Sequence, residues 1–499
     1  MTLSSFARET RFMSAVDQAT LVRDKKASPA ELLEAAIERY NEYNPHINAV
    51  NIVWLEHARE LAKRTGSQVS PAPFHGVPTL FKDLHTLYAG QPITNGNKAL
   101  KQANYIATQN TVMVDRYLAA GFVPFGRTNS CEWGSLPVTE PEAWGPTKNP
   151  HDLSRTCGGS SGGSGAAVAA GIVPLAHASD GGGSIRIPAS CNGLVGLKTS
   201  RGRISVGPLR DEFGFGVELC VSHTVADTAA LLDAVHGAGV GDGVVAPLPA
   251  RTFSSEVGAH VAPLRIGLLD HDPLGAHVDV ECRDAARATA TLLQSLGHHV
   301  DESYPPAMAD ATFPPRFGAM WATNQAVSRD ALAAMLNRAV TRDDIEAVNW
   351  AQAEYASKAS ALDYAKAMNA AATFRRALAQ WWHDGFDLLL TPTLARLPFP
   401  IGSFANDPGD PLKPSRLASE WVRFTAQFNM SGQPAISLPL ARTPAGLPIG
   451  VQLVAAYGRE DLLLRVASQL ETAAPWKHFT PSALGCPHGS RRAKPAHLR

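Results

Sequence analysis

The chain has 499 residues, with 45 basic and 45 acidic side chains and therefore a formal net charge of zero. A neutral chain lacks the basic surface that nucleic-acid-binding proteins use, so we expect no nucleic-acid partner. Hydrophobic residues make up 45% of the chain, which fits a globular protein with a large core. The six cysteines form no C-x-x-C pair and predict neither a disulfide framework nor a zinc site.

The hydrophobic pattern predicts alternating helices and strands. Helical spacing covers residues 13–43, 54–64, 111–120, 224–236, 281–296, 318–383 and 459–471. Strand patterns cover residues 76–82, 122–125, 172–178, 264–269, 387–390, 435–440 and 450–454. This alternation predicts an α/β protein, and we expect its buried sheet to be largely parallel.

Two sequence features bear on cellular location. The N-terminal segment has no apolar stretch of the kind found in secretory signals, and no apolar run reaches 18 residues. These features predict a cytoplasmic protein without a membrane span. The 17 histidines form no H-E-x-x-H motif, so we expect no metal ion, and no cofactor is expected either.

The most informative stretch lies between residues 158 and 188, where two glycine clusters each contain a serine. Ser160 lies in the first cluster and Ser184 in the second. Glycine allows positive φ angles and close approach of the backbone to a ligand, and consecutive amides can form an anion-binding nest. A serine beside such amides is what acyl transfer requires, because the amides stabilise the developing oxyanion. The stretch therefore predicts an active site.

Other interpretations of the first cluster remain open at this point. Residues 158–162 also fit the nucleophile elbow G-x-S-x-G, which would make Ser160 the nucleophile, although no HGG-type oxyanion loop precedes them. A phosphate-binding loop would need a lysine followed by serine or threonine after the last glycine, and that pair is missing. Either cluster alone could also be a structural tight turn without chemistry.

Longer motifs resemble the amidase signature family of serine hydrolases. The matching segments are residues 158–164, 180–188, 193–198, 429–439 and 446–452, together with Lys82 and Asp83. The resemblance covers roughly residues 15–475. It implies a mixed, twisted central sheet with helices on both faces, in a single domain over residues 1–486. Residues 305–385 would be a helical insertion near the substrate pocket, and the basic tail, residues 487–499, would be disordered.

The resemblance also implies a Ser-cisSer-Lys triad. Ser184 would be the nucleophile, Ser160 would relay protons from a cis peptide, and Lys82 would be the base. A lysine acts as a base only when it is neutral, which requires burial to depress its pKa. The residues expected to support the triad are the oxyanion-hole glycines Gly181, Gly182 and Gly183, and the loop-holding residues Ser161, Asp180 and Arg186.

Within the family, residues 139–145 and 455–464 are similar to the 6-aminohexanoate cyclic-dimer hydrolases, which open nylon-oligomer amides. The region around Trp321 diverges from that group. Trp144, Trp321 and Asn429 are the predicted substrate-pocket residues.

These similarities predict hydrolysis of C–N bonds in small linear or cyclic amides, including nylon-oligomer-like and aryl amides. Two alternatives remain: a urethanase or esterase that uses the same triad, and the A-type subunit of a tRNA-dependent amidotransferase. Because dimers are common among such enzymes, a homodimer is one expected assembly.

Overall fold

The structure is a computed structural model that describes residues 3–68, 70–208, 210, 214–407, 409–476, 481 and 484. The predicted disordered tail, residues 487–499, lies outside the described residues. Within the described part of the chain, every helix is too short or too polar to cross a lipid bilayer.

In the described residues, the strands form two main sheets and one short hairpin. They are β1 (Val50–Val53), β2 (Pro78–Lys82), β3 (Val123–Thr128), β4 (Lys148–Asn149), β5 (Asp152–Thr156), β6 (Leu175–Asp180), β7 (Val195–Lys198), β8 (Val217–Ser222), β9 (Arg265–Leu268), β10 (His299–Glu302), β11 (Leu388–Pro392), β12 (Ala435–Arg442) and β13 (Pro448–Ala455). The larger sheet has the order β10-β9-β11-β13-β12-β7-β8-β6, and the smaller sheet has the order β1-β3-β2.

The large sheet is mixed and flanked by helices, which confirms the α/β class and the mixed sheet of the family resemblance. The expectation of a largely parallel sheet was wrong. Among the described strands of the large sheet, the β10–β9 and β9–β11 pairings are parallel, whereas every pairing from β11 to β6 is antiparallel. Short connections, such as the turn between β12 and β13, make the next strand run in the opposite direction. The alternation of helix and strand patterns in the sequence does not show the direction of each strand.

The helices occupy most of the expected segments. They are α1 (Ser5–Glu9), α2 (Ala15–Arg23), α3 (Pro29–Ile47), α4 (Leu55–Gly66), α5 (Lys98–Gln102), α6 (Val112–Ala119), α7 (Gly162–Ala169), α8 (Arg186–Asn192), α9 (Val225–Val235), α10 (Val280–Ser295), α11 (Phe313–Leu336), α12 (Ala347–Ala356), α13 (Ala361–His383), α14 (Lys413–Trp421), α15 (Ala426–Ser431) and α16 (Glu460–Ala473). The segment 13–43 is two helices, because Lys25 takes a positive φ and Ser28 caps α3 in a capping box with Glu31.

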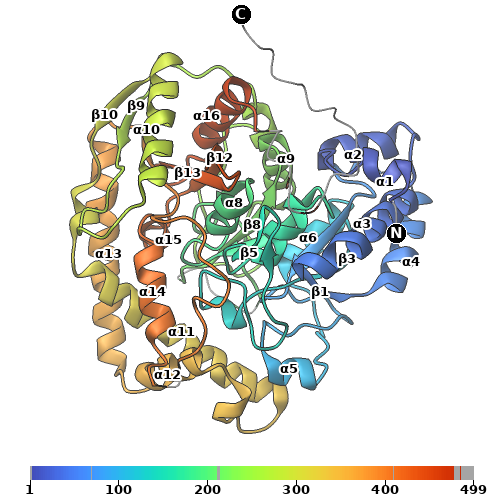
Figure 1. The fold of residues 1–499 in the computed structure, drawn as a ribbon, viewed down its shortest axis with the longest axis horizontal. Coiled ribbons are helices and arrows are strands. Elements are labelled where there is room, and N and C mark those ends of the chain that lie inside the picture. The colour runs from blue at the N-terminus through green and yellow to red at the C-terminus, as the bar shows by residue number, and fades with distance from the viewer. Residues whose placement is uncertain are drawn as a thin grey trace, which may run out of the picture.

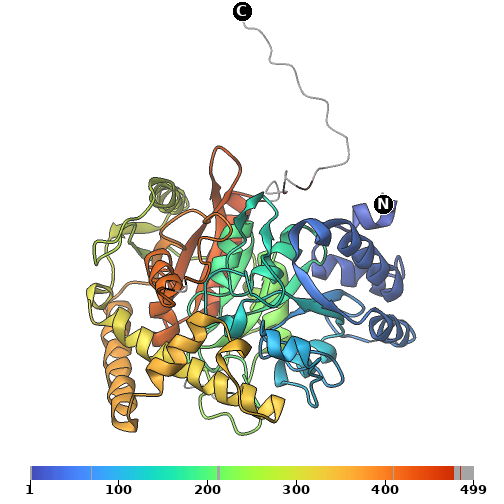
Figure 2. The ribbon, with the colours of Figure 1, turned by 60° about the horizontal axis from the view of Figure 1, so that its bottom comes forward.

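The helical segment between β10 and β11 lies on the opposite side of the molecule from the N-terminal helices. Figure 1 shows α11 to α13 of this segment at the left and bottom, next to α14, with α1 to α4 at the right. In Figure 2 the helices in yellow and orange come forward at the lower left. The glycine clusters lie between these two regions, at the end of β6 and the starts of α7 and α8.

The two main sheets meet where β2 lies beside β6. The hydroxyl of Thr79 donates to the carbonyl of Leu175 (3.1 Å), and the backbone N–H of Lys82 donates to Nδ1 of His177 (3.4 Å). This contact brings the end of β2 next to the end of β6. Residues from the first hundred positions and from the central glycine stretch thereby share one site.

Candidate active site

Lys82 is the last residue of β2, a strand that is buried along its whole length. Its Nζ lies 2.7 Å from Oγ of Ser160 and 3.0 Å from Oγ of Ser179. Burial lowers the pKa of Lys82 to about 7, and the carboxylate of Asp180 opposes that shift. A buried lysine of this kind is partly neutral at physiological pH and can accept a proton.

Ser160 lies in a backbone turn that requires glycine at the two preceding positions. The Gly159–Ser160 peptide bond is cis, and Gly158 has a φ of 76°. A Cβ on Gly159 would lie 2.3 Å from the carbonyl oxygen of Val138, so no larger residue fits there. Ser160 is 1% exposed, and its hydroxyl points to Lys82.

Ser161 connects this turn to β6. Its hydroxyl donates to the carbonyl of Ser179 (3.1 Å) and accepts from the backbone N–H of the same residue (3.2 Å). Ser161 is also the N-cap residue of α7 and makes no side-chain cap bond there. It therefore fixes the start of α7 to the end of β6, on either side of Lys82.

Asp180 and Arg186 form a fully buried ion pair that holds the second glycine cluster. Arg186 donates to both carboxylate oxygens, through Nε (2.9 Å) and Nη2 (3.0 Å). The backbone amides of Gly183 (2.7 Å) and Ile185 (3.2 Å) donate to the same carboxylate. Burial alone would raise the pKa of Asp180, but the charge and hydrogen bonds of Arg186 outweigh it and lower the pKa to about 2.

Ser184 follows the glycine cluster, is 7% exposed and lies in the wall of a cavity. Among the described residues, no acceptor is bonded to the backbone amides of Gly181, Gly182 or Ser184. The Gly183 amide was predicted to be an oxyanion donor, but Asp180 already occupies it. In the described part of the chain, the amides of Gly181, Gly182 and Ser184 therefore remain available to an acceptor from the substrate.

The cavity next to Ser184 has a volume of about 590 Å³ and a mostly apolar lining. Its walls come from the loop at residues 134–137, from α11 and α12, and from α14 and α15. Phe317 and Trp321 stack on each other along α11, with ring centroids 5.6 Å apart. The indole lies over Gly181, because a Cβ on that glycine would be only 3.3 Å from Cζ3 of Trp321.

Two of the three predicted pocket residues lie elsewhere. Within the described residues, the cavity lining includes Trp321 but neither Trp144 nor Asn429. The indole N–H of Trp144 donates to the hydroxyl of Thr94 (3.0 Å), and Lys101 lies over its ring. Asn429 is 1% exposed. It bonds Asp180 through its side-chain nitrogen (2.9 Å) and so supports the ion pair rather than the substrate.

Sequence reasoning missed Ser179 and the cavity residue Gln352. Strand alternation places His177 and Ser179 on one face of β6, and this signal could have identified Ser179 as a neighbour of the lysine. Gln352 has no comparable signal, because the packing of α12 against α11 brings it to the cavity. Its Nε2 donates to the hydroxyl of Ser415 (2.7 Å).

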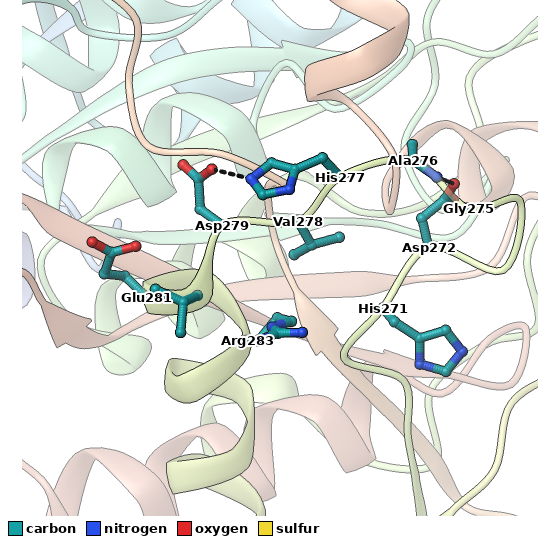
Figure 3. A pocket seen from close by; sticks show the side chains of 10 residues that line it. His271, Asp272, Gly275, Ala276, His277, Val278, Asp279, Glu281 and Arg283 are labelled. Atoms are coloured by element: carbon teal, nitrogen blue, oxygen red, sulfur yellow. Dashed lines mark hydrogen bonds and ion pairs between the residues drawn. The ribbon is translucent and has the colours of Figure 1, made fainter.

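A second pocket, of about 530 Å³, lies at the start of α10. Figure 3 shows His277 directed toward Asp279 there, with Nε2 and Oδ1 3.0 Å apart. The residues lining this pocket include no serine or lysine, so it lacks the groups needed for acyl transfer. Among the described residues, no cluster of three or more His, Cys, Asp or Glu side chains could hold a metal ion.

Comparison with known proteins assigns the family. The family described as Amidase matches residues 31–464. The chain belongs to the amidase signature family. As a member of this family, it is an amidohydrolase that acts on carbon–nitrogen bonds other than peptide bonds.

Two relatives of this family member cover nearly the whole chain. It is 42% identical over 483 residues to a 6-aminohexanoate-cyclic-dimer hydrolase from Paenarthrobacter ureafaciens, covering 95% of this chain and 97% of the relative. It is 34% identical to an acylamidase from Rhodococcus erythropolis, covering 94% of this chain and 97% of the relative.

Solved structures agree with this family assignment. A 6-aminohexanoate cyclic dimer hydrolase in complex with substrate matches with a TM-score of 0.91 and 41% identity, covering 95% of this chain and all of the other. A bacterial aryl acylamidase of the amidase signature family matches with a TM-score of 0.86 and 28% identity, covering 96% of this chain and all of the other.

Proposed function

We propose that this amidohydrolase cleaves small amides through an acyl-enzyme formed on Ser184, with Ser160 and Lys82 as its proton relay. The observation that carries the proposal is the 2.7 Å contact between Lys82 Nζ and Ser160 Oγ, at a buried lysine whose pKa is about 7. A serine hydroxyl is a weak nucleophile and needs an adjacent base. A neutral Lys82 supplies that base through Ser160.

The reaction proceeds in two halves. Ser184 Oγ attacks the carbonyl carbon of the substrate, and its proton passes to Ser160 and then to Lys82. The free amides of Gly181, Gly182 and Ser184 stabilise the oxyanion of the tetrahedral intermediate. The intermediate collapses as the C–N bond breaks, and the leaving amine takes the proton back through the same relay. Water then hydrolyses the ester on Ser184 by the same steps.

The substrate that we propose is a small amide with an apolar body. The cavity walls are mostly apolar and aromatic, and a volume of about 590 Å³ is in the range that holds a drug-sized ligand. One relative is named for a cyclic dimer of 6-aminohexanoate, and one solved structure is named as an aryl acylamidase. Cyclic, linear and aryl amides are therefore the first candidate substrates. Carbamates and esters present the same electrophilic carbonyl and are the second class to test.

A turnover panel tests the proposal. Purified enzyme is assayed on the 6-aminohexanoate cyclic dimer, a linear oligomer, a 4-nitroanilide, an aryl carbamate and the matching ester. Mass spectrometry of the quenched reaction should then find an acyl group on Ser184. If the enzyme turns over only the carbamate, its substrate is a urethane and not an amide. An acyl group on Ser160 would overturn the assignment of the nucleophile.

A further inference from the structure

A buried carboxylate connects two walls of the cavity. Glu132 begins a short 3₁₀ helix, η1 (Glu132–Gly134), and is fully buried. Its Oε1 accepts from the side-chain nitrogen of Asn97 (2.7 Å). Its Oε2 accepts from the side-chain nitrogen of Asn349 (2.7 Å) and from the backbone N–H of Glu346 (2.9 Å). A single side chain therefore satisfies three donors, two of which belong to the start of α12.

The residues that follow Glu132 reach the site itself. Gly134 has a φ of 69°, and a Cβ added there would lie 3.1 Å from Oγ of Ser160. Gly134, Ser135, Leu136 and Pro137 all line the cavity. Glu132 thus lies two residues before this wall of the cavity, which adjoins Ser160.

The other partner of Glu132 is α12, which forms a second wall. Glu346 is the N-cap residue of α12 and makes no side-chain cap bond to it. Glu132 instead accepts from the backbone N–H of Glu346, as the acidic residue of a capping box does, but from a distant part of the chain. Farther along the helix, Gln352 and Tyr355 line the cavity, and Gln352 bonds Ser415 of α14.

We propose that Glu132 is a positioning residue that fixes α12 against the loop beside Ser160 and thereby determines how tightly the enzyme binds the part of a substrate that extends into the cavity. The inference rests on the proposed function only in taking this cavity as the substrate site. A carboxylate is required because both oxygens accept hydrogen bonds. A glutamine at this position would have an NH₂ group in place of one carboxylate oxygen. That group would face the N–H donors of Asn97 or of α12 and could not accept from them.

The test compares a short and a long substrate that share one leaving group, the 4-nitroanilides of acetic and decanoic acid. For Glu132→Gln we expect a KM for the decanoyl compound about five- to tenfold higher, the effect of losing one buried hydrogen bond. We expect kcat for the acetyl compound to stay within about twofold of wild type. Glu354→Gln, on the exposed side of α12, is the matched control and should leave both values unchanged.

A second variant and a binding measurement test the positioning role even if Glu132→Gln does not fold or the wild-type enzyme does not turn over the anilides. Asn349→Ala removes a donor from α12 while Glu132 remains, so it should raise the same KM if Glu132→Gln does not fold. On a Ser184→Ala background, the Kd of the decanoyl anilide should rise by the same factor, which tests the inference even if wild-type turnover is absent. An unchanged KM, or a fall in kcat that is equal for both substrates, would overturn the positioning role.

Discussion

The Nζ atom of Lys82 lies 2.7 Å from the Oγ of Ser160, although 78 positions separate the two residues in the chain. The lysine has no exposed surface, and its second contact is a hydroxyl rather than a carboxylate. A lysine held by two hydroxyls in a buried site keeps its positive charge poorly. In the proposed mechanism this pair joins a base to a proton carrier without a histidine.

The pH dependence of activity should follow Lys82. Its pKa is lowered from 10.5 to about 7, so the amine is protonated below pH 7 and neutral above it. Because only the neutral amine accepts a proton, kcat/KM should rise with pH through about 7 and then level off. Below that midpoint it should fall about tenfold per pH unit. Steady-state kinetics between pH 5.5 and 9 measures this. A profile that is flat across the range would contradict a lysine base.

Lys82→Arg should be inactive at every pH in that range. An arginine keeps its charge and cannot act as the base, although it preserves the positive group. Its circular dichroism spectrum should match that of wild type if the fold is intact. Retained turnover in a folded Lys82→Arg protein would show that another group takes the proton.

The Ser184→Ala and Ser160→Ala variants should differ in whether they still form an acyl-enzyme. Ser184→Ala removes the proposed nucleophile and should lower kcat by at least about 10³-fold, with KM little changed. Ser160→Ala removes only the proposed proton relay and should lower kcat by about 10²- to 10⁴-fold. The acyl-enzyme should still be detectable by mass spectrometry in Ser160→Ala and never in Ser184→Ala. The reverse result would support the nucleophile-elbow alternative.

The Asp180–Arg186 pair should matter for stability as well as for activity. Arg186→Gln leaves a buried carboxylate without its cation, which costs about 3–5 kcal/mol of unfolding free energy. Arg59→Gln is the control, because Arg59 pairs with Glu34 at the surface and should contribute at most about 1 kcal/mol. Urea denaturation followed by fluorescence measures both. Equal losses of unfolding free energy in the two variants would mean that the buried pair contributes no more to stability than the surface pair.

Trp321 and Trp144 should respond differently to alanine substitution. Trp321 forms the cavity wall over Gly181, so Trp321→Ala should raise KM for aryl amides about tenfold, the effect of losing roughly 1.4 kcal/mol of apolar contact. Trp144→Ala removes a ring outside the cavity lining and should lower the melting temperature with KM unchanged. A KM effect at Trp144 alone would restore it as a pocket residue.

The sequence predicted the local features of this protein better than its long-range ones. Strand and helix segments such as residues 78–82 and 225–235 carry clear spacing. The glycine clusters directed attention to Ser160 and Ser184, of which the first contacts Lys82 and the second lines the cavity. The direction of strands in the large sheet could not be predicted, because it depends on connections rather than on periodicity. Asn429 was assigned to the pocket because its motif follows the family pattern, and only packing shows that it bonds Asp180.

Lys82 and Ser179 come from different sheets, and this has a consequence for how the enzyme gains and loses activity. Their contact exists only when β2 has docked beside β6, across 97 positions of sequence. Contacts between residues so distant in the chain are slow to form, because loop closure must precede them. Under the proposed mechanism, turnover requires this docking of the two sheets and therefore reports whether it has occurred. In refolding experiments we expect the recovery of activity to lag behind the recovery of helical signal, and the lag should measure this last assembly step.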